Sequence, residues 1–242
     1  MRAREVGLGR KWVYVVTETG HVGFAFAVPE APLHVEVIED EHSLGELMGL
    51  AWQHPLLTSV ALAAANAAMQ ALVDDEEDVV CFSCDLLEML GLRKGDRVAI
   101  IGYVHRVADM IADIVGRGNV VLYEDNPMHR LDAAEKGLAA RPGNQFLIEA
   151  EDYDVVLATG ASLVDPRLMA ALERRMPRVF AMVGPTSSFH PGTARQLGLT
   201  VYGGSHVPRE NRDRVLRRIK AGYGFKAISK LVRKWSVALE NN

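Results

Sequence analysis

From Arg97 to the C-terminal region, short apolar segments alternate with segments of helical character. The apolar segments are 97–101, 120–123, 154–158, 178–183 and 199–202, and the helical segments are 107–115, 132–140, 166–175, 193–197 and 208–220. Parallel strands need a long crossover between them, and a sheet covered on both sides needs strands that are apolar throughout. This part of the chain therefore predicts a parallel sheet with helices on both faces.

The first ninety residues follow a different pattern, with strands first and helices afterwards. Segments 12–16 and 22–28 are rich in β-branched and aromatic residues and flank the turn signal Thr17–Gly20, so they predict a hairpin. Segment 34–38 is a candidate third strand. Two helices are expected next, over 44–52 and 60–72. We therefore expect a small α+β domain over residues 1–90 and an α/β domain over 91–242.

The second of those helices has a distinct start signal and an unusual composition. Pro55 is expected to break the chain before it, and Thr58 or Ser59 to cap its first turn. The helix is apolar on nearly every face, which predicts burial on most sides.

Composition excludes several classes of protein. Of 242 residues, 49% are hydrophobic and 24% are charged. These proportions are ordinary for a globular chain. No apolar run reaches the roughly 18 residues of a membrane helix, and the N-terminus has no apolar signal region. We therefore expect a cytoplasmic protein with no membrane partner.

Charge is divided unevenly along the chain. Residues 1–90 contain 4 basic and 15 acidic side chains, whereas residues 91–242 contain 23 and 16. Segment 209–234 holds much of the basic excess, but its aromatic residues form no stacking array, so we expect no nucleic-acid partner. A solvated face, or docking on the acidic first part, is favoured, and opposite charges are expected to help the two domains form one cleft.

Ligands of open α/β sheets bind at the carboxyl ends of the strands, so the residues that follow each strand are candidates. Gly102 and Tyr103 follow the first strand, where a single glycine stands in place of a full dinucleotide fingerprint. Glu124 follows the second strand, at close to the spacing from Gly102 that places an acid on ribose hydroxyls. The alternatives are a tight turn at Gly102 and an ordinary polar loop residue at Glu124.

The next two strands are followed by loops that offer hydroxyls, glycines and free N–H groups. The candidate binding residues there are Thr159, Gly160, Gly184, Pro185, Thr186 and Ser187. Such loops suit an anion or a polar small molecule, although capping and turn chemistry explain the same residues.

Three further features carry chemistry of their own. Asn66 is a polar exception in an apolar helix, and either bonds neighbouring backbone or faces a cleft. Cys81 and Cys84 form a CxxC motif, for which a packed thiol pair or an incidental disulfide is favoured over a redox or metal site. The histidines lack metal-ligand spacing. His34 and His42 flank an acidic stretch that is better explained as a solvated loop.

The motifs VAIIGY, LYEDNP, DVVLATGASLVDP and MVGPTSSFHP, in this order, are similar to a prokaryotic family of unknown function that is linked to heavy-metal chelation. SVALAAANA at 59–67 resembles the N-terminal helix of the same family. The resemblance implies an enolase N-terminal-like domain followed by a Rossmann-like domain. It also implies a site between them for condensation or hydrolysis of pterin-, flavin- or siderophore-like molecules.

The resemblance carries site roles over to Asn66, Gly102, Tyr103, Glu124, Thr159, Gly160 and the 184–187 loop. A metal ion or a nucleotide-like or pterin-like ligand is the expected cofactor, with the metal left open. His105 and Glu18 are the candidates for proton transfer, because catalysis needs such a group. Whether the protein is an enzyme stays open. The alternatives are non-enzymatic binding of a metal or chelate, and methyltransferase-like binding of S-adenosylmethionine. A homodimer is expected.

Overall fold

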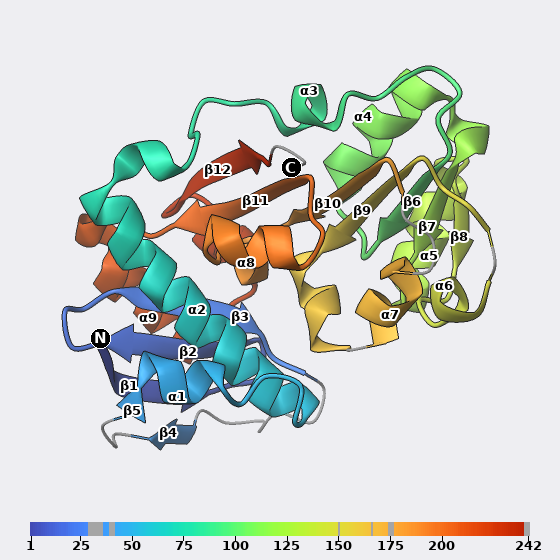
Figure 1. Cartoon of the computed structure of the whole chain (residues 1–242). Coiled ribbons are helices and arrows are strands. Elements are labelled where there is room, and N and C mark those ends of the chain that lie inside the picture. The colour runs from blue at the N-terminus through green and yellow to red at the C-terminus, as the bar shows by residue number, and fades with distance from the viewer. Residues whose placement is uncertain (29–35, 39–41, 150, 166, 174–176, 240–242) are drawn as a thin grey trace. The chain divides into compact units, whose positions relative to one another are not determined.

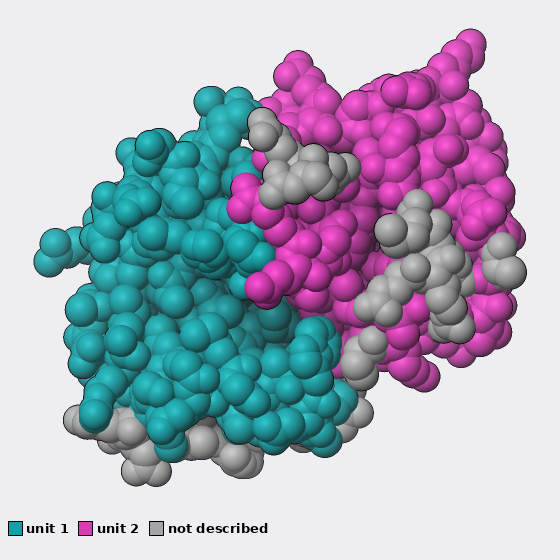
Figure 2. All heavy atoms as spheres, in the orientation of Figure 1, with its two compact units in different colours: residues 1–84, 184–193, 203–237 teal, residues 85–183, 194–202, 238–242 magenta. Residues whose placement is uncertain are grey.

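The computed structural model describes residues 1–28, 36–38, 42–149, 151–165, 167–173 and 177–239 (Figure 1). The chain forms two compact units (Figure 2). Unit 1 comprises Met1–Cys84, Gly184–Thr193 and Gly203–Val237, and unit 2 comprises Asp85–Val183, Ala194–Tyr202 and Ala238–Asn242. Each unit therefore draws on separate stretches of sequence, and the division into 1–90 and 91–242 stays a prediction about sequence domains.

Unit 1 contains an antiparallel sheet of five strands in the order β3-β2-β1-β4, with β5 also paired to β1. The strands are β1 (Arg2–Leu8), β2 (Trp12–Thr17), β3 (Val22–Phe26), β4 (Glu36–Ile38) and β5 (His42–Ser43). The β2–β3 hairpin is confirmed, with Val16 opposite Val22. Strand β1 was not predicted. His34 lies outside the described residues, as do residues 39–41.

The helices of this sheet are α1 (Leu44–Met48) and α2 (Pro55–Asp75). Helix α2 starts before the predicted residue 60, because proline fits the first helical turn and His54 accepts a hydrogen bond from the Leu56 N–H. The predicted caps, Thr58 and Ser59, instead donate their hydroxyls to carbonyls one helical turn back. The prediction of the helix was right, and that of its start was wrong.

Helix α2 is the core helix of unit 1. By length and composition alone it could cross a membrane, but 67% of its most apolar window is buried inside the structure. It lies across β2 and β3 (Figure 1), where Ala63 and Ala67 have no exposed surface. Gly23 of β3 makes this contact possible, since a Cβ there would lie 2.1 Å from the Ala67 nitrogen. The predicted burial of α2 is confirmed.

The other face of the same sheet is covered by the basic C-terminal segment. Helices α9 (Arg212–Lys220) and α10 (Phe225–Ile228) pack through Val215, Ile219 and Ile228 against Tyr14 and Phe24. Alternate residues of β2 point to opposite faces, so Val13 and Val15 join the α2 side instead. The sheet thus needs both N-terminal and C-terminal residues to bury its two faces.

Acidic and basic segments meet inside unit 1. Lys220 pairs with Glu5 at 2.6 Å, Arg233 pairs with Glu77 at 2.6 Å, and Arg212 pairs with Asp74. Unit 1 contains 14 basic and 15 acidic residues, and unit 2 contains 13 and 16. Docking of the basic segment on the acidic first part is confirmed. The charges of each unit are close to balanced, because the basic C-terminal segment shares unit 1 with the acidic N-terminal part.

Two histidines contact Asp74 at the end of α2. His206 is buried and His21 is half-buried. Asp74 Oδ1 lies 2.7 Å from His206 Nε2 and Asp74 Oδ2 lies 3.2 Å from His21 Nε2. Burial lowers the pKa of His206, and burial together with the Arg212 charge lowers the pKa of His21. Both rings are therefore neutral in the folded protein at neutral pH.

We predict that stability falls on acidification because of these rings. Below the ordinary histidine pKa of 6.5 the unfolded chain takes up protons that the folded rings do not, so the free energy of unfolding decreases with falling pH. Each histidine contributes at most about 1.4 kcal/mol per pH unit. Urea unfolding at a series of pH values between about 7.5 and about 5.5 measures this change. The free energy of unfolding should fall less steeply with pH in His206→Gln, which keeps a donor toward Asp74 without titrating. An equally steep fall in the variant and the natural protein would contradict the prediction.

The second sheet has seven strands in the order β12-β11-β10-β9-β6-β7-β8. The strands are β6 (Val98–Ile101), β7 (Val120–Tyr123), β8 (Ala139–Arg141), β9 (Val155–Thr159), β10 (Val179–Val183), β11 (Val201–His206) and β12 (Arg233–Ala238). The pairs from β10 to β8 are parallel. The predicted α/β class is confirmed. Strands β8 and β12 were not predicted.

Helices flank this sheet. They are α3 (Leu86–Leu90), α4 (His105–Val115), α5 (Pro127–Glu135), α6 (Gln145–Ile148), α7 (Arg167–Glu173) and α8 (Pro191–Gln196), the last shared with unit 1. Short 3-10 turns occupy Glu77–Val79, Arg117–Asn119, Gly160–Val164, Pro185–Ser187 and Arg209–Asn211. Helix α5 was predicted over 132–140. It begins earlier because Asn126 caps it and Pro127 opens its first turn.

Candidate functional site

The predicted site residues fall into two groups, and each group belongs to one unit. Unit 2 holds Gly102, Tyr103, His105, Glu124, Thr159 and Gly160. Unit 1 holds Glu18, Asn66, Gly184, Pro185, Thr186 and Ser187.

In unit 2 the strand order reverses at β6, which has β7 on one side and β9 on the other. Gly102 directly follows β6 and has a positive φ of 84°. A Cβ at this position would lie 2.4 Å from Thr159 Oγ1, at the end of β9. Glycine is required here both by the backbone and by the neighbouring strand. The tight-turn interpretation of Gly102 is supported, and its contact with a ligand stays a prediction.

Glu124 is held firmly at the end of β7, with 14% of its side chain exposed. Its Oε2 accepts a hydrogen bond from the Tyr103 N–H at 2.9 Å and its Oε1 accepts one from the Asn126 N–H at 2.8 Å. Arg130 donates to the Glu124 carbonyl at 2.7 Å. A carboxylate offers about four acceptor positions, so this one retains capacity for hydroxyl or N–H donors of a ligand.

Three rings lie beside this carboxylate. The ring centroids of Tyr103 and His105 are 3.9 Å apart, and His129 of α5 lies 5.9 Å from Tyr103 and 5.5 Å from His105. His129 Nδ1 also lies 3.4 Å from Glu124 Oε2. The ends of β6 and β7 thus present aromatic surface and a fixed carboxylate together.

Asp132 and Lys136 of the α5 region complete this cluster. Asp132 Oδ2 accepts hydrogen bonds from the Tyr103 hydroxyl at 2.7 Å and from Lys136 at 3.1 Å, and lies 3.2 Å from His105 Nδ1. The bonds from Tyr103 and Lys136 lower the pKa of Asp132 to about 2, while burial raises the pKa of Tyr103. At neutral pH Asp132 is therefore a carboxylate. A proton on His105 Nδ1 would point at it, which leaves Nε2 as an acceptor.

His129, Asp132 and Lys136 were not predicted as site residues. Their signal is helical spacing, because residues three and four apart share one face. That face becomes visible once the helix is taken to start at Pro127, with Asn126 as its cap. A helix predicted to start at residue 132 leaves His129 outside, so the shared face of His129, Asp132 and Lys136 cannot be recognised.

In unit 1, Asn66 fastens the 184–187 loop to β3. Its Nδ2 donates to the carbonyls of Phe24 at 2.8 Å, Pro185 at 3.0 Å and Thr186 at 3.3 Å. The side chain is almost fully buried, and its Oδ1 has no hydrogen-bond partner in the described part of the chain. These are the backbone bonds that one interpretation of Asn66 predicts. A ligand role stays a prediction.

The hydroxyls of the 184–187 loop are also used internally. Thr186 Oγ1 accepts from the Phe26 N–H at 3.0 Å, and Ser187 Oγ donates to the carbonyls of Gly184 and Gly203 at 2.8 and 2.7 Å. Both side chains are buried. The sequence suggested that these hydroxyls are available to a ligand. In the structure they form hydrogen bonds to backbone groups that hold the loop in place.

The remaining candidates lie elsewhere. Glu18 is exposed in the β2–β3 turn, where its carboxylate accepts from the Arg2 N–H at 3.3 Å. Cys81 and Cys84 form a disulfide, so in this state neither offers a thiolate to a metal. Within the described ranges, no group of three or more His, Cys, Asp or Glu residues is arranged to hold a metal ion.

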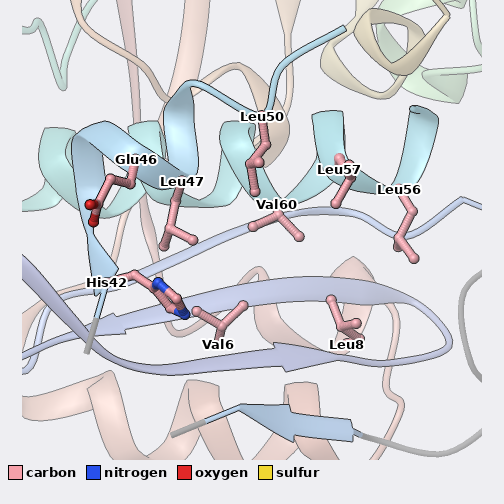
Figure 3. A pocket seen from close by; sticks show the side chains of 9 residues that line it. All are labelled: Val6, Leu8, His42, Glu46, Leu47, Leu50, Leu56, Leu57 and Val60. Carbon is pink, nitrogen blue, oxygen red and sulfur yellow. The ribbon is translucent and has the colours of Figure 1, made fainter. Parts of the chain in front are cut away.

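Unit 1 also has a pocket of about 270 Å³ between β1, α1 and the start of α2 (Figure 3). Val6, Leu47 and Val60 are typical of its aliphatic lining, to which His42 and Glu46 add the polar side chains. None of the predicted site residues lines it. The polar cluster of unit 2 is therefore the better candidate for binding a polar molecule.

A mostly parallel sheet flanked by helices, with polar side chains at the ends of its strands, defines an α/β protein. Residues 85–238 match the family model DUF364, described as "Putative heavy-metal chelation", and residues 1–69 match DUF4213, which has the same description. The chain belongs to the DUF364 family, and the family resemblance seen in the sequence is confirmed.

Two crystal structures of DUF364 proteins of unknown function share the fold. The protein from Desulfitobacterium hafniense DCB-2 is 21% identical with a TM-score of 0.74, over 98% of this chain and 92% of that one. The protein from Pyrococcus horikoshii is 20% identical with a TM-score of 0.71, over 97% of this chain and 94% of that one. No curated protein matches the chain.

Proposed function

We propose that the polar cluster of unit 2 binds a small planar molecule able to chelate metal, such as a pterin-, flavin- or siderophore-like compound. The cluster consists of Tyr103, His105, Glu124, His129 and Asp132. The observation that carries the proposal is the placement of three rings, 3.9 to 5.9 Å apart, beside the fixed and partly buried carboxylate of Glu124. The family description supports a ligand with a role in chelation.

The chemistry of the cluster suits such a ligand. Aromatic side chains favour offset or edge contacts with a conjugated ring. The open acceptor positions of Glu124 favour N–H or hydroxyl donors, which pterins, flavins and catechols all carry. A hydroxyl pair of a ribose would satisfy the same carboxylate, so S-adenosylmethionine belongs to the ligands to be tested.

His105 is the proposed proton-transfer residue. Asp132 orients its ring through Nδ1, at 3.2 Å, and half of the His105 side chain is exposed. A neutral imidazole held in this way accepts a proton at Nε2 and returns it later in the reaction. Condensation or hydrolysis needs this kind of group, and the carboxylate of Asp132 would stabilise the charged ring.

Thermal shift with a panel of pterins, flavins, catechol chelators, nucleosides and S-adenosylmethionine tests the site. At about one hundred times Kd, a bound ligand adds roughly 2.7 kcal/mol of stability, which raises the Tm by several degrees. Glu124→Ala should abolish the shift, because it removes the main acceptor. Glu135→Ala, which removes an exposed carboxylate at the end of α5, should keep it. The proposal fails if no compound shifts the Tm, or if both variants respond like the natural protein.

The family description also favours a second function, the binding of a metal or metal chelate without turnover. Equilibrium dialysis followed by elemental analysis separates the two functions. Stoichiometric metal retention with no change in the chelator would support storage or transport, whereas chemical change of the bound molecule would support an enzyme.

The α/β fold with one mostly buried apolar helix is of the kind found in soluble proteins. We propose a cytoplasmic location, a homodimer and no nucleic-acid or membrane partner. Light scattering on the purified chain measures the oligomeric state, and a gel shift at low salt tests nucleic-acid binding.

A further inference from the structure

The CxxC segment is used by none of the proposed chemistry of unit 2. Cys81 and Cys84 are joined by a disulfide that closes a short loop before helix α3. Cys84 is exposed and Cys81 is half-buried. A small reductant can therefore reach one sulfur of the bond without unfolding the protein.

The Phe82 ring, which lies inside this loop, contacts the side chains of Arg233 and His206 in unit 1. The Arg233 guanidinium carbon lies 3.6 Å from the centroid of the Phe82 ring, and the His206 ring lies 6.1 Å from it at a steep angle. Arg233 also pairs with Glu77 at 2.6 Å. Phe82 thus connects the loop to the Asp74–His206 contact described above.

The two ends of the loop are held differently. The Cys81 N–H donates to the Ser236 carbonyl at 3.1 Å, and the Ser236 N–H donates to the Cys81 carbonyl at 2.9 Å. Cys84 is linked back to this anchored position by the disulfide. Breaking that bond leaves the Cys81 end attached to β12 and gives the residues after it more conformational freedom.

We propose that Cys81 and Cys84 are a reversible redox site, reduced by dithiols and acting on the position of Phe82. A thiolate of the dithiol attacks Cys84 Sγ, the disulfide breaks, and Cys81 leaves as a thiolate that takes up a proton. The second thiol attacks the mixed disulfide and releases Cys84. Two electrons and two protons pass to the protein, and the reductant leaves as its own disulfide. Reduction releases Phe82 from Arg233 and His206.

Alkylation of the full chain tests the redox step. The protein is equilibrated at graded ratios of reduced to oxidised dithiothreitol and treated with N-ethylmaleimide. Its intact mass is then measured by mass spectrometry. Two labels should appear together as the ratio rises, with unchanged far-UV circular dichroism, and they should disappear after reoxidation. Labelling that requires denaturant, or two labels before any reductant is added, would overturn the proposal.

Chymotrypsin cleavage tests the effect on Phe82. Cleavage after Phe82 should rise about tenfold on reduction, because local opening exposes the chain to the protease. Cleavage at Tyr223, which is 56% exposed, should stay the same. The double variant Cys81→Ser/Cys84→Ser should behave as reduced protein without reductant, and Ser83→Ala should keep the difference between the two states. Equal cleavage after Phe82 in both states would refute the release.

Discussion

Gly23→Ala should lower the free energy of unfolding by about 3 kcal/mol or prevent folding altogether. The added Cβ would lie 2.1 Å from the Ala67 nitrogen and 2.2 Å from the Ala63 carbonyl oxygen. Both are backbone atoms of α2, which no side-chain rotation can move. Relief requires the core helix to shift away from β3, and this opens the packing between Ala63, Ala67 and the sheet.

Urea unfolding followed by circular dichroism measures this change. The matched control is Gly118→Ala, where a Cβ would meet no atom within 4 Å. The effect of this control should stay within about 0.5 kcal/mol, as for most surface substitutions. Equal stability of the two variants would contradict the close packing of the α2 backbone against Gly23 of β3.

Asn66→Ala should cost about 2–4 kcal/mol, the second-largest effect that we expect. The substitution removes the donor shared by the carbonyls of Phe24, Pro185 and Thr186 and leaves a buried gap beside them. Asn66→Asp should cost more, because it places a buried carboxylate against carbonyl oxygens. In both variants the 185–187 turn would lose the link through Asn66 to β3 and would keep the hydrogen bond from the Phe26 N–H to Thr186 Oγ1.

Gln53→Ala is the control for Asn66, because the Gln53 amide is exposed and donates to one carbonyl, that of Gly49 at 3.0 Å. Its effect should stay below about 1 kcal/mol. Hydrogen exchange of the backbone amides of residues 186–188 should rise in the Asn66 variants and not in Gln53→Ala. Unchanged exchange and stability in Asn66→Ala would contradict the role of Asn66 as an anchor.

The parts of the fold that were predicted from sequence have strong local signals. The β2–β3 hairpin and strands β6, β7, β9 and β10 are apolar, β-branched runs bounded by turns. Strands β8 and β12 stand at the two ends of their sheet, and both carry arginine. Edge strands are often short and charged, so their sequences resemble loops.

Long-range pairing explains most of what sequence reasoning missed. Segment 203–237 packs in one unit with the N-terminal residues, and no local pattern reports a contact between positions so far apart. The same holds for Thr186 and Ser187, whose hydroxyls find backbone partners only after folding. Tyr103, His105 and Glu124 were predicted to lie near one another because the carboxyl ends of parallel strands meet at one edge, and the structure brings them together.

A crystal structure with the ligand that co-purifies, or with the compound that raises the Tm most, tests the central claim most directly. We predict that its ring lies on Tyr103 and His105 and that its N–H or hydroxyl groups donate to Glu124. A ligand bound elsewhere, for instance in the aliphatic pocket beside Val6 and Leu47, with the Tyr103–Glu124 hydrogen bond unchanged, would contradict the assignment of the site to unit 2.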